Sequence, residues 1–454
     1  MMNTTAPRPL RLPRLPLVPQ LPRFFSLTYL LLVLLTLLCL APEAALAQMS
    51  MDTAQLRLAD AQALALQRNP DLRIALAAVQ SARAAIASAD TAPNPVLTLQ
   101  TMGVNPSTGV GPGSLRSKAV DSAIRIDQQF ERGGKRELRV RNAQLLEQAA
   151  REDASDVRRQ LKLAVAQAYY DLLAAQEKRD ILRDTLALYQ QTVDAAERRR
   201  KAGDLAGADV ARIRVDALRA ANDAESAESA LLRAQETLAL ALGSLPDPRR
   251  LRAIDAWPDL AEIDDGAVLE TIVDARADVR AARARVRAAE EGVRLALSLR
   301  TRDVTVGVQA EHYPQNGANA YGTGNSFGIA VQIPLYLRNQ YQGEIRNAEA
   351  QLDSARESLE KMRMAARSEL SRSRDEARVA AAALRRYDAE LLPAAERSAD
   401  AAEYAFKNGA IGVMDALDAR RTRRAIRLEA AGARADHARA LAAWHLAQET
   451  GDKE

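Results

Sequence analysis

The second half of this 454-residue chain repeats the first half. Three separated segments match in the same order, at an offset of roughly 206 residues. The matched pairs are Asp71–Val79 with Asp278–Val286, Arg141–Ala143 with Arg346–Ala348, and Lys201–Gly203 with Lys407–Gly409. One such match arises easily by chance, but three in register do not. We therefore expect two copies of one structural unit.

Each copy is predicted to have the same layout. A helix (71–90 or 267–300) precedes two strand-like segments, a very long helix, a short glycine turn and another helix. On this pattern, residues 48–250 form the first repeat, 251–266 a linker and 267–454 the second repeat. The predicted hairpins are 95–130 and 302–336.

The long helices dominate the pattern. They run from about Gly134 to Lys201 and from about Gln340 to Lys407, and such a length spans roughly 100 Å. Each carries one apolar stripe at three- and four-residue steps. The stripes are Leu161, Val165, Ala168, Leu172 and Ala175, and Leu352, Ala355, Leu359, Met362 and Ala366. Aromatic residues make up only 4% of the chain, which favours helices packed on small residues over a thick globular core. Coiled-coil or helical-barrel packing is expected, with a kink or unpaired turn at Pro393.

Four segments break the helical period: 95–103, 119–130, 302–311 and 325–336. Three alternate apolar with polar or small residues, as in the wall of a membrane β-barrel with lipid outside and water inside. The alternative is an ordinary half-buried hairpin, but the long helices leave little else for these strands to pack on. Four strands cannot close a barrel, and an open edge in lipid leaves backbone groups unpaired. The chain must therefore oligomerise, and two copies (eight strands) and three copies (twelve) both remain open.

The N-terminus has the features of a secretory signal peptide, residues 1–47. Four arginines precede an apolar run, and Ala45-Leu46-Ala47 fits a cleavage site after Ala47. The alternative is a permanent membrane anchor. The only cysteine, Cys39, lies in this segment behind Leu38, a poor context for lipid attachment. Without the segment the net charge falls from +4 to +1, which gives no electrostatic basis for nucleic-acid binding.

Residues able to perform chemistry are scarce. The only histidines are His312, His437 and His445, and the last two are eight residues apart, too far for a metal pair on one helix. The sequence has no Ser/His/Asp or Cys/His arrangement and no phosphate-binding loop. We expect no catalytic residue, no cofactor and no resident metal site, and therefore not an enzyme.

Two kinds of motif resemble the TolC family of outer-membrane efflux proteins. Tyr404–Ala419 is similar to the family's aromatic-x-x-Gly turn and the helix start after it, whereas Arg200–Asp209 has Arg200 where an aromatic residue is usual. Phe130–Arg136 and Ile333–Asn339 resemble the CzcC-like heavy-metal branch. The family resemblance covers roughly residues 55–450.

This resemblance implies a mainly α fold with a small membrane β-barrel. Three chains would form a twelve-stranded barrel in the outer-membrane bilayer, continued by a periplasmic α-barrel tunnel of twelve helices. It implies a periplasmic adaptor and an inner-membrane transporter of the resistance-nodulation-division (RND) type as partners, and heavy-metal cations as cargo. The alternatives are a channel for drugs, other organic compounds or type I secretion, or a periplasmic adaptor scaffold, although adaptors have one helical hairpin and a β-rich remainder.

The glycine turns are the candidate functional site. Gly203 and Gly409 suit a reversal that needs positive φ, and the resemblance places Gly203, Lys407, Asn408 and Gly409 at the periplasmic tip that contacts the adaptor. Asp415 and Asp418, with Asp209 in the first repeat, are candidates for a ring of acids around the entrance. Arg420 and Arg421 are the expected partners that hold such a ring together. The alternative is that these acids only favour the helix dipole.

Overall fold

The computed structural model describes residues 55–104, 106–107, 120–260, 263, 269–313 and 324–450. The predicted signal peptide and its cleavage site at Ala47 lie outside these residues. Within the described ranges, no helix is both long enough and apolar enough to cross a membrane.

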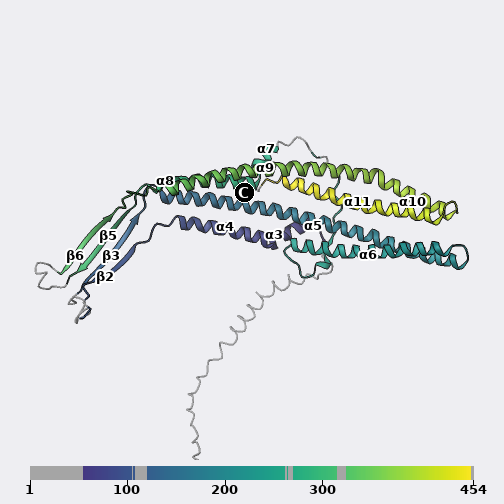
Figure 1. The fold of residues 1–454 in the computed structure, drawn as a ribbon, viewed down its shortest axis with the longest axis horizontal. Coiled ribbons are helices and arrows are strands. Elements are labelled where there is room, and N and C mark those ends of the chain that lie inside the picture. The colour runs from purple at the N-terminus through teal and green to yellow at the C-terminus, as the bar shows by residue number, and fades with distance from the viewer. Residues whose placement is uncertain are drawn as a thin grey trace, which may run out of the picture. The chain divides into compact units, whose positions relative to one another are not determined.

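The same order of elements occurs twice along the chain (Figure 1). The first series is β1 (Gln55–Leu56), α3 (Leu58–Arg68), α4 (Pro70–Ala89), β2 (Val96–Met102), β3 (Asp121–Phe130), α5 (Lys135–Lys201), α6 (Gly207–Ala241) and the 3₁₀ turn η2 (Pro248–Arg250). The second is β4 (Arg252–Ala253), α7 (Leu269–Ala275), α8 (Ala277–Ser298), β5 (Val304–His312), β6 (Asn325–Gln332), α9 (Gln342–Arg386), the π-helical segment η3 (Tyr387–Leu391), α10 (Leu392–Lys407) and α11 (Val413–Ala447).

The helix that opens each series is split in two. Asn69 separates α3 from α4 and Arg276 separates α7 from α8, and both residues have extended backbone (φ −64°, ψ 130° and φ −63°, ψ 144°). Pro70 accounts for the first break, because a proline disfavours the helical conformation of the preceding residue. The predicted helix 267–300 is therefore two helices, and α3 precedes the predicted helix 71–90.

The predicted long helices are confirmed. Helix α5 has 67 residues without a break. Its counterpart in the second series consists of α9, η3 and α10, which follow one another without a gap. The five-residue π-helical segment η3 ends two residues before Pro393. Proline has no N–H with which to continue the i→i−4 bonds, so the predicted local unpairing takes the form of a π-bulge.

The four predicted strands form one antiparallel sheet in the order β2-β3-β5-β6. One face carries cross-strand rows of apolar side chains, such as Ile126, Val308 and Ile329, with exposures of 46%, 52% and 79%. The other face carries Arg125, Asp127, Gln309 and Glu311, in agreement with the predicted alternation. Strand β6 ends at Gln332, earlier than predicted, because Pro334 cannot donate to the ladder.

A short parallel pair, β1 with β4, joins the start of the described chain to the predicted linker 251–266. Tyr169 of α5 is fully buried beneath it. Its hydroxyl donates to the Leu56 carbonyl (3.0 Å) and accepts from the N–H groups of Ile254 (3.2 Å) and Asp255 (3.1 Å). Burial raises the pKa of Tyr169 to about 12, so the hydroxyl remains protonated.

A buried ion-pair cluster links the two series. Arg276 is 1% exposed and contacts Asp278 (2.8 Å) and Glu369 (2.7 Å), and Glu369 also pairs with Arg159 of α5 (3.0 Å). Burial tends to raise the pKa of Glu369, but hydrogen bonds and charges from Arg276 and Arg159 outweigh it, so the pKa lies below its usual value. This contact fixes α9 against α5 and the start of α8.

Candidate functional site

The two glycine turns have the same geometry. Gly203 (φ 88°) and Gly409 (φ 73°) both adopt the predicted left-handed conformation. The N–H after each glycine returns to a carbonyl five residues earlier, from Asp204 to Arg199 (2.9 Å) and from Ala410 to Ala405 (2.8 Å). This is the Schellman arrangement. A Cβ at either glycine would meet nothing within 4 Å, so glycine is needed for its backbone conformation and not for space.

Lys407 and Asn408 lie at the end of α10, directly before the second turn. Asn408 donates from its side chain to the Tyr404 carbonyl (2.9 Å), and Lys407 pairs with Glu403 (3.2 Å) while its side chain remains 70% exposed. The hydrogen bond from Lys407 is the main cause that lowers the pKa of Glu403, so that carboxylate stays charged. Tyr404, 73% exposed, adds an aromatic surface beside this charge.

The three candidate acids follow the turns, but their surroundings differ. Asp415 accepts a hydrogen bond from the Gly412 N–H (3.3 Å) at the start of α11. Asp209 occupies the matching first turn of α6, and its carboxylate forms a long ion pair with the Arg212 guanidinium (3.9 Å). Asp418 is 64% exposed. Asp415 therefore has a structural role at the start of α11, independent of the predicted role in an acidic ring at the tunnel entrance.

Only one of the two arginines expected to hold the acids does so. Arg421 contacts Asp418 (2.5 Å) and also Asp216 of α6, which is 7% exposed. Arg420 instead pairs with Glu403 of α10 (3.4 Å). Burial tends to lower the pKa of Arg421, but the hydrogen bonds and charges of Asp216 and Asp418 outweigh it and raise the pKa. Arg421 thus links the acid near the second turn to the helix after the first turn.

Sequence reasoning missed the contacts between α6 and α11. Besides Asp216 with Arg421, Asp223 pairs with Arg424 (2.9 Å). A signal was present, because Asp209, Asp216 and Asp223 are spaced at seven residues and so share one face of α6. A buried cluster lies beside these ion pairs and joins the two turn regions. Its members are Tyr189, Ala196, Val210, Ile213, Ala220 and Leu417.

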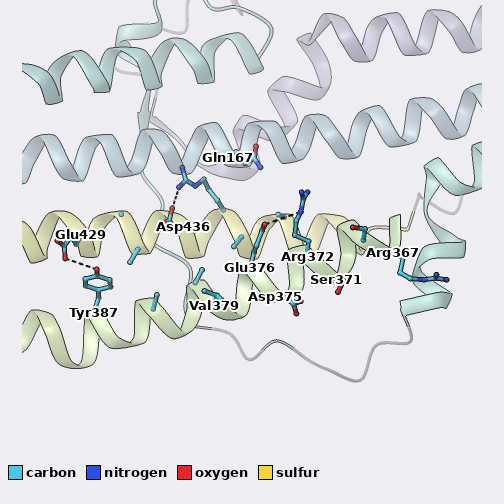
Figure 2. Close-up of a pocket in the computed structure, with 18 of the residues that line it drawn as sticks. Gln167, Arg367, Ser371, Arg372, Asp375, Glu376, Val379, Tyr387, Glu429 and Asp436 are labelled. Carbon is cyan, nitrogen blue, oxygen red and sulfur yellow. Dashed lines mark hydrogen bonds and ion pairs between the residues drawn. The ribbon is translucent and has the colours of Figure 1, made fainter. Parts of the chain in front are cut away.

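A groove lies elsewhere, along α9, η3 and α11 (Figure 2). It has a volume of about 1340 Å³ and is lined mainly by small and charged residues, among them Ala383, Gly432 and Ala440. Tyr387 of η3 reaches across it to Glu429 of α11 (3.3 Å). Across the described parts of the chain, no three or more His, Cys, Asp or Glu residues are grouped so that they could hold a metal ion.

Comparison with known proteins gives the family. A sequence model of the Outer membrane efflux protein family matches residues 61–244 and 268–448, most of both repeats. The chain belongs to this family. As an outer membrane efflux protein it is a channel of the TolC type located in the outer membrane.

One curated relative is 25% identical to this efflux protein over 397 residues, 84% of this chain and 90% of the relative. It is the cobalt-zinc-cadmium resistance protein CzcC of Cupriavidus metallidurans. Solved channels share the fold. CusC has a TM-score of 0.73 at 18% identity, covering 88% of this chain and 94% of CusC. The outer membrane protein VceC of Vibrio cholerae has a TM-score of 0.68 at 19% identity, covering 87% and 96%. These family members and structural neighbours are channels, not enzymes.

Proposed function

We propose that this efflux protein is the outer-membrane exit duct of a tripartite system that exports heavy-metal cations. The observation that carries the choice of cargo is the similarity to a cobalt-zinc-cadmium resistance protein over 90% of that protein's length. The duct passes its cargo passively, and an inner-membrane RND-type transporter supplies the energy. Drugs, other organic compounds and type I secretion substrates are the competing cargoes.

The functional form is a homotrimer in this proposal. Within the described part of the chain, strands β2 and β6 each pair with one neighbour, which leaves each with a free edge in the single chain. Three copies joined edge to edge give twelve strands and leave no edge exposed to lipid. The groove of Figure 2, lined by small residues of α9 and α11, offers a surface for a helix of the neighbouring copy.

The turns at Gly203 and Gly409 form the end that meets the periplasmic adaptor in this proposal. The exposed Lys407 and Tyr404, together with Asn408, present charge, an aromatic ring and an amide on one turn. In the trimer, Asp209, Asp415 and Asp418 would stand near the narrow end of the tunnel, where a ring of acids favours cations. The exposure of Asp418 supports its role in such a ring.

A growth assay tests both the cargo and the tip. Deletion of the gene in its native host should lower the concentrations of zinc, cobalt and cadmium that stop growth, while tolerance to dyes and antibiotics stays unchanged. The wild-type gene should restore metal tolerance. A Lys407→Glu, Asn408→Asp variant should restore it less well at equal abundance in the outer membrane, because its tip charge is reversed. Loss of drug tolerance with intact metal tolerance would assign the cargo to organic compounds.

A further inference from the structure

The polar face of the sheet carries long side chains that lie flat along the wall. Arg125 of β3 donates from Nε to both carboxylate oxygens of Asp127 on the same strand (2.9 and 2.8 Å). The cross-strand partner of Asp127 is Gly307 on β5. Both charged groups lie directly above this glycine, which is buried although the next residue, Val308, is 52% exposed.

Gly307 is required for space. A Cβ there would overlap Asp127 Oδ1 and stand 3.0 Å from Arg125 Nη2 and 3.1 Å from Arg125 Nε. Its φ is not among the positive values, so any residue could adopt this backbone. A methyl group at position 307 must therefore displace the Arg125–Asp127 pair, which cannot move into the sheet backbone beneath it.

A second glycine repeats the arrangement one strand further on. Gln309 of β5 pairs across the ladder with Gly328 of β6, and a Cβ at Gly328 would stand 3.1 Å from Gln309 Cγ. Gln309 in turn donates to Glu311 (3.0 Å), which also accepts from Ser326 (3.3 Å) and Tyr313. Side chains of β3 thus cover the glycine of β5, and a side chain of β5 covers the glycine of β6.

We propose that Gly307, with Gly328, sets the bore of the channel where it crosses the outer membrane. Each glycine gives the polar side chains of the neighbouring strand room to lie along the wall, which leaves the lumen open and keeps Arg125 neutralised by Asp127. The inference rests on the proposed function, because it takes the polar face of the sheet to be the water-filled side. In a trimer, three copies of Gly307 act at one level of the pore.

Single-channel conductance in planar bilayers tests the proposal. Gly307→Ala should lower the conductance of the assembled channel, because three ion pairs rise into the lumen. In an Arg125→Ala, Asp127→Ala background the same substitution should have no effect, since the three atoms nearest the added methyl group are then absent. Gly328→Ala should have a smaller effect, because its Cβ would stand 3.1 Å from Gln309 Cγ, where the Cβ at position 307 overlaps Asp127 Oδ1. Gly343→Ala in α9, where a Cβ meets nothing within 4 Å, is the matched control.

The possible results distinguish the proposed channel function from the proposed role of Gly307. A wild-type protein that forms no channel would refute the proposed function. A conducting wild type with Gly307→Ala unchanged, or lowered equally in both backgrounds, would refute only the role of the glycine. Native mass in mild detergent reports assembly. If Gly307→Ala fails to assemble but the triple variant assembles, the displaced pair is the cause, as proposed. If neither assembles, glycine is needed for another reason and the proposal is wrong.

Discussion

At the level of single residues, the two glycine turns depend on local backbone conformation, whereas the ion pairs between the turn regions join residues far apart in the sequence. The positive φ at Gly203 and Gly409 follows from the turn itself, so it could be read locally. The partner of Arg421 could not, because Asp216 is 205 residues away and lies on a different helix, α6. Arg420, next in sequence, turns to Glu403 on a different helix.

The different surroundings of Asp415 and Asp418 predict different effects on removal. Trivalent cations added on the tip side should block the wild-type channel in planar bilayers at low concentration. Asp418→Ala should weaken the block with little change in thermal stability, because its ion pair with Arg421 is solvent-exposed. Asp415→Ala should weaken the block and also cost about 1 kcal/mol at the start of α11, because the capping hydrogen bond is lost.

The control for this experiment is Asp204→Ala, which removes an acid next to the first turn that is not proposed to belong to the ring. If the Asp415→Ala, Asp418→Ala double variant is blocked as strongly as the wild type, these acids serve only the helix start and the dipole.

At the level of elements, periodicity predicted the helices and strands, whereas their interruptions depended on packing. The break at Asn69 has a local cause in Pro70, but the break at Arg276 has none in the sequence and coincides with its buried contacts to Asp278 and Glu369. Pro393 indicated a defect in the long helix. The sequence could not predict that this defect is a π-bulge, because the bulge contacts the neighbouring helix α11 through Tyr387–Glu429 and Asp388–Arg434.

The π-bulge predicts where the helix tolerates a deletion. A π-bulge holds one residue more than an α-helix does over the same rise. Removal of Ala389 should convert η3 to α-helix and keep the faces of α9 and α10 in phase. Removal of Ala380 in α9 should rotate everything after it by roughly 100° and misplace the Arg420–Glu403 and Arg423–Asp400 contacts.

Thermal unfolding in detergent and native mass compare the two deletions. The variant without Ala389 should keep the proposed trimer and most of its melting temperature, whereas the variant without Ala380 should lose assembly. Equal loss in both variants would mean that the bulge is an obligatory shape and not an accommodated extra residue.

At the level of the whole molecule, the sequence predicted that a single chain is incomplete, because four strands cannot close. The sequence did not decide between two and three copies, since edge pairing alone does not determine the number of subunits. The observed register confirms that the apolar side chains of β3, β5 and β6 share one exposed face, which the sequence pattern had predicted strand by strand.

The orientation of this face predicts an asymmetric response to charge. Ile329→Arg, on the exposed apolar face, should cost about 2–4 kcal/mol at the bilayer midplane and reduce the fraction of trimer measured by native mass in mild detergent. Gln332→Arg, on the opposite face of the same strand, should be mild. Equal tolerance at both positions would reverse or remove the assigned lipid face, and a stable folded monomer of the wild type would refute the closed barrel.

The β1–β4 pair also bears on the order in which the chain acquires its structure. It joins Leu56 to Ala253, the Leu58 N–H donates to Asp255 (2.7 Å), and Asn69 donates to the Ala241 carbonyl (3.0 Å). Every partner in these contacts precedes α7. A chain exported with its N-terminus first therefore has both sides of the β1–β4 contact available before α7 and the elements after it leave the secretion machinery. The first repeat is then structured before the second repeat packs on it. Glu369 pairs with Arg159 and Glu449 pairs with Lys162 only in this later step.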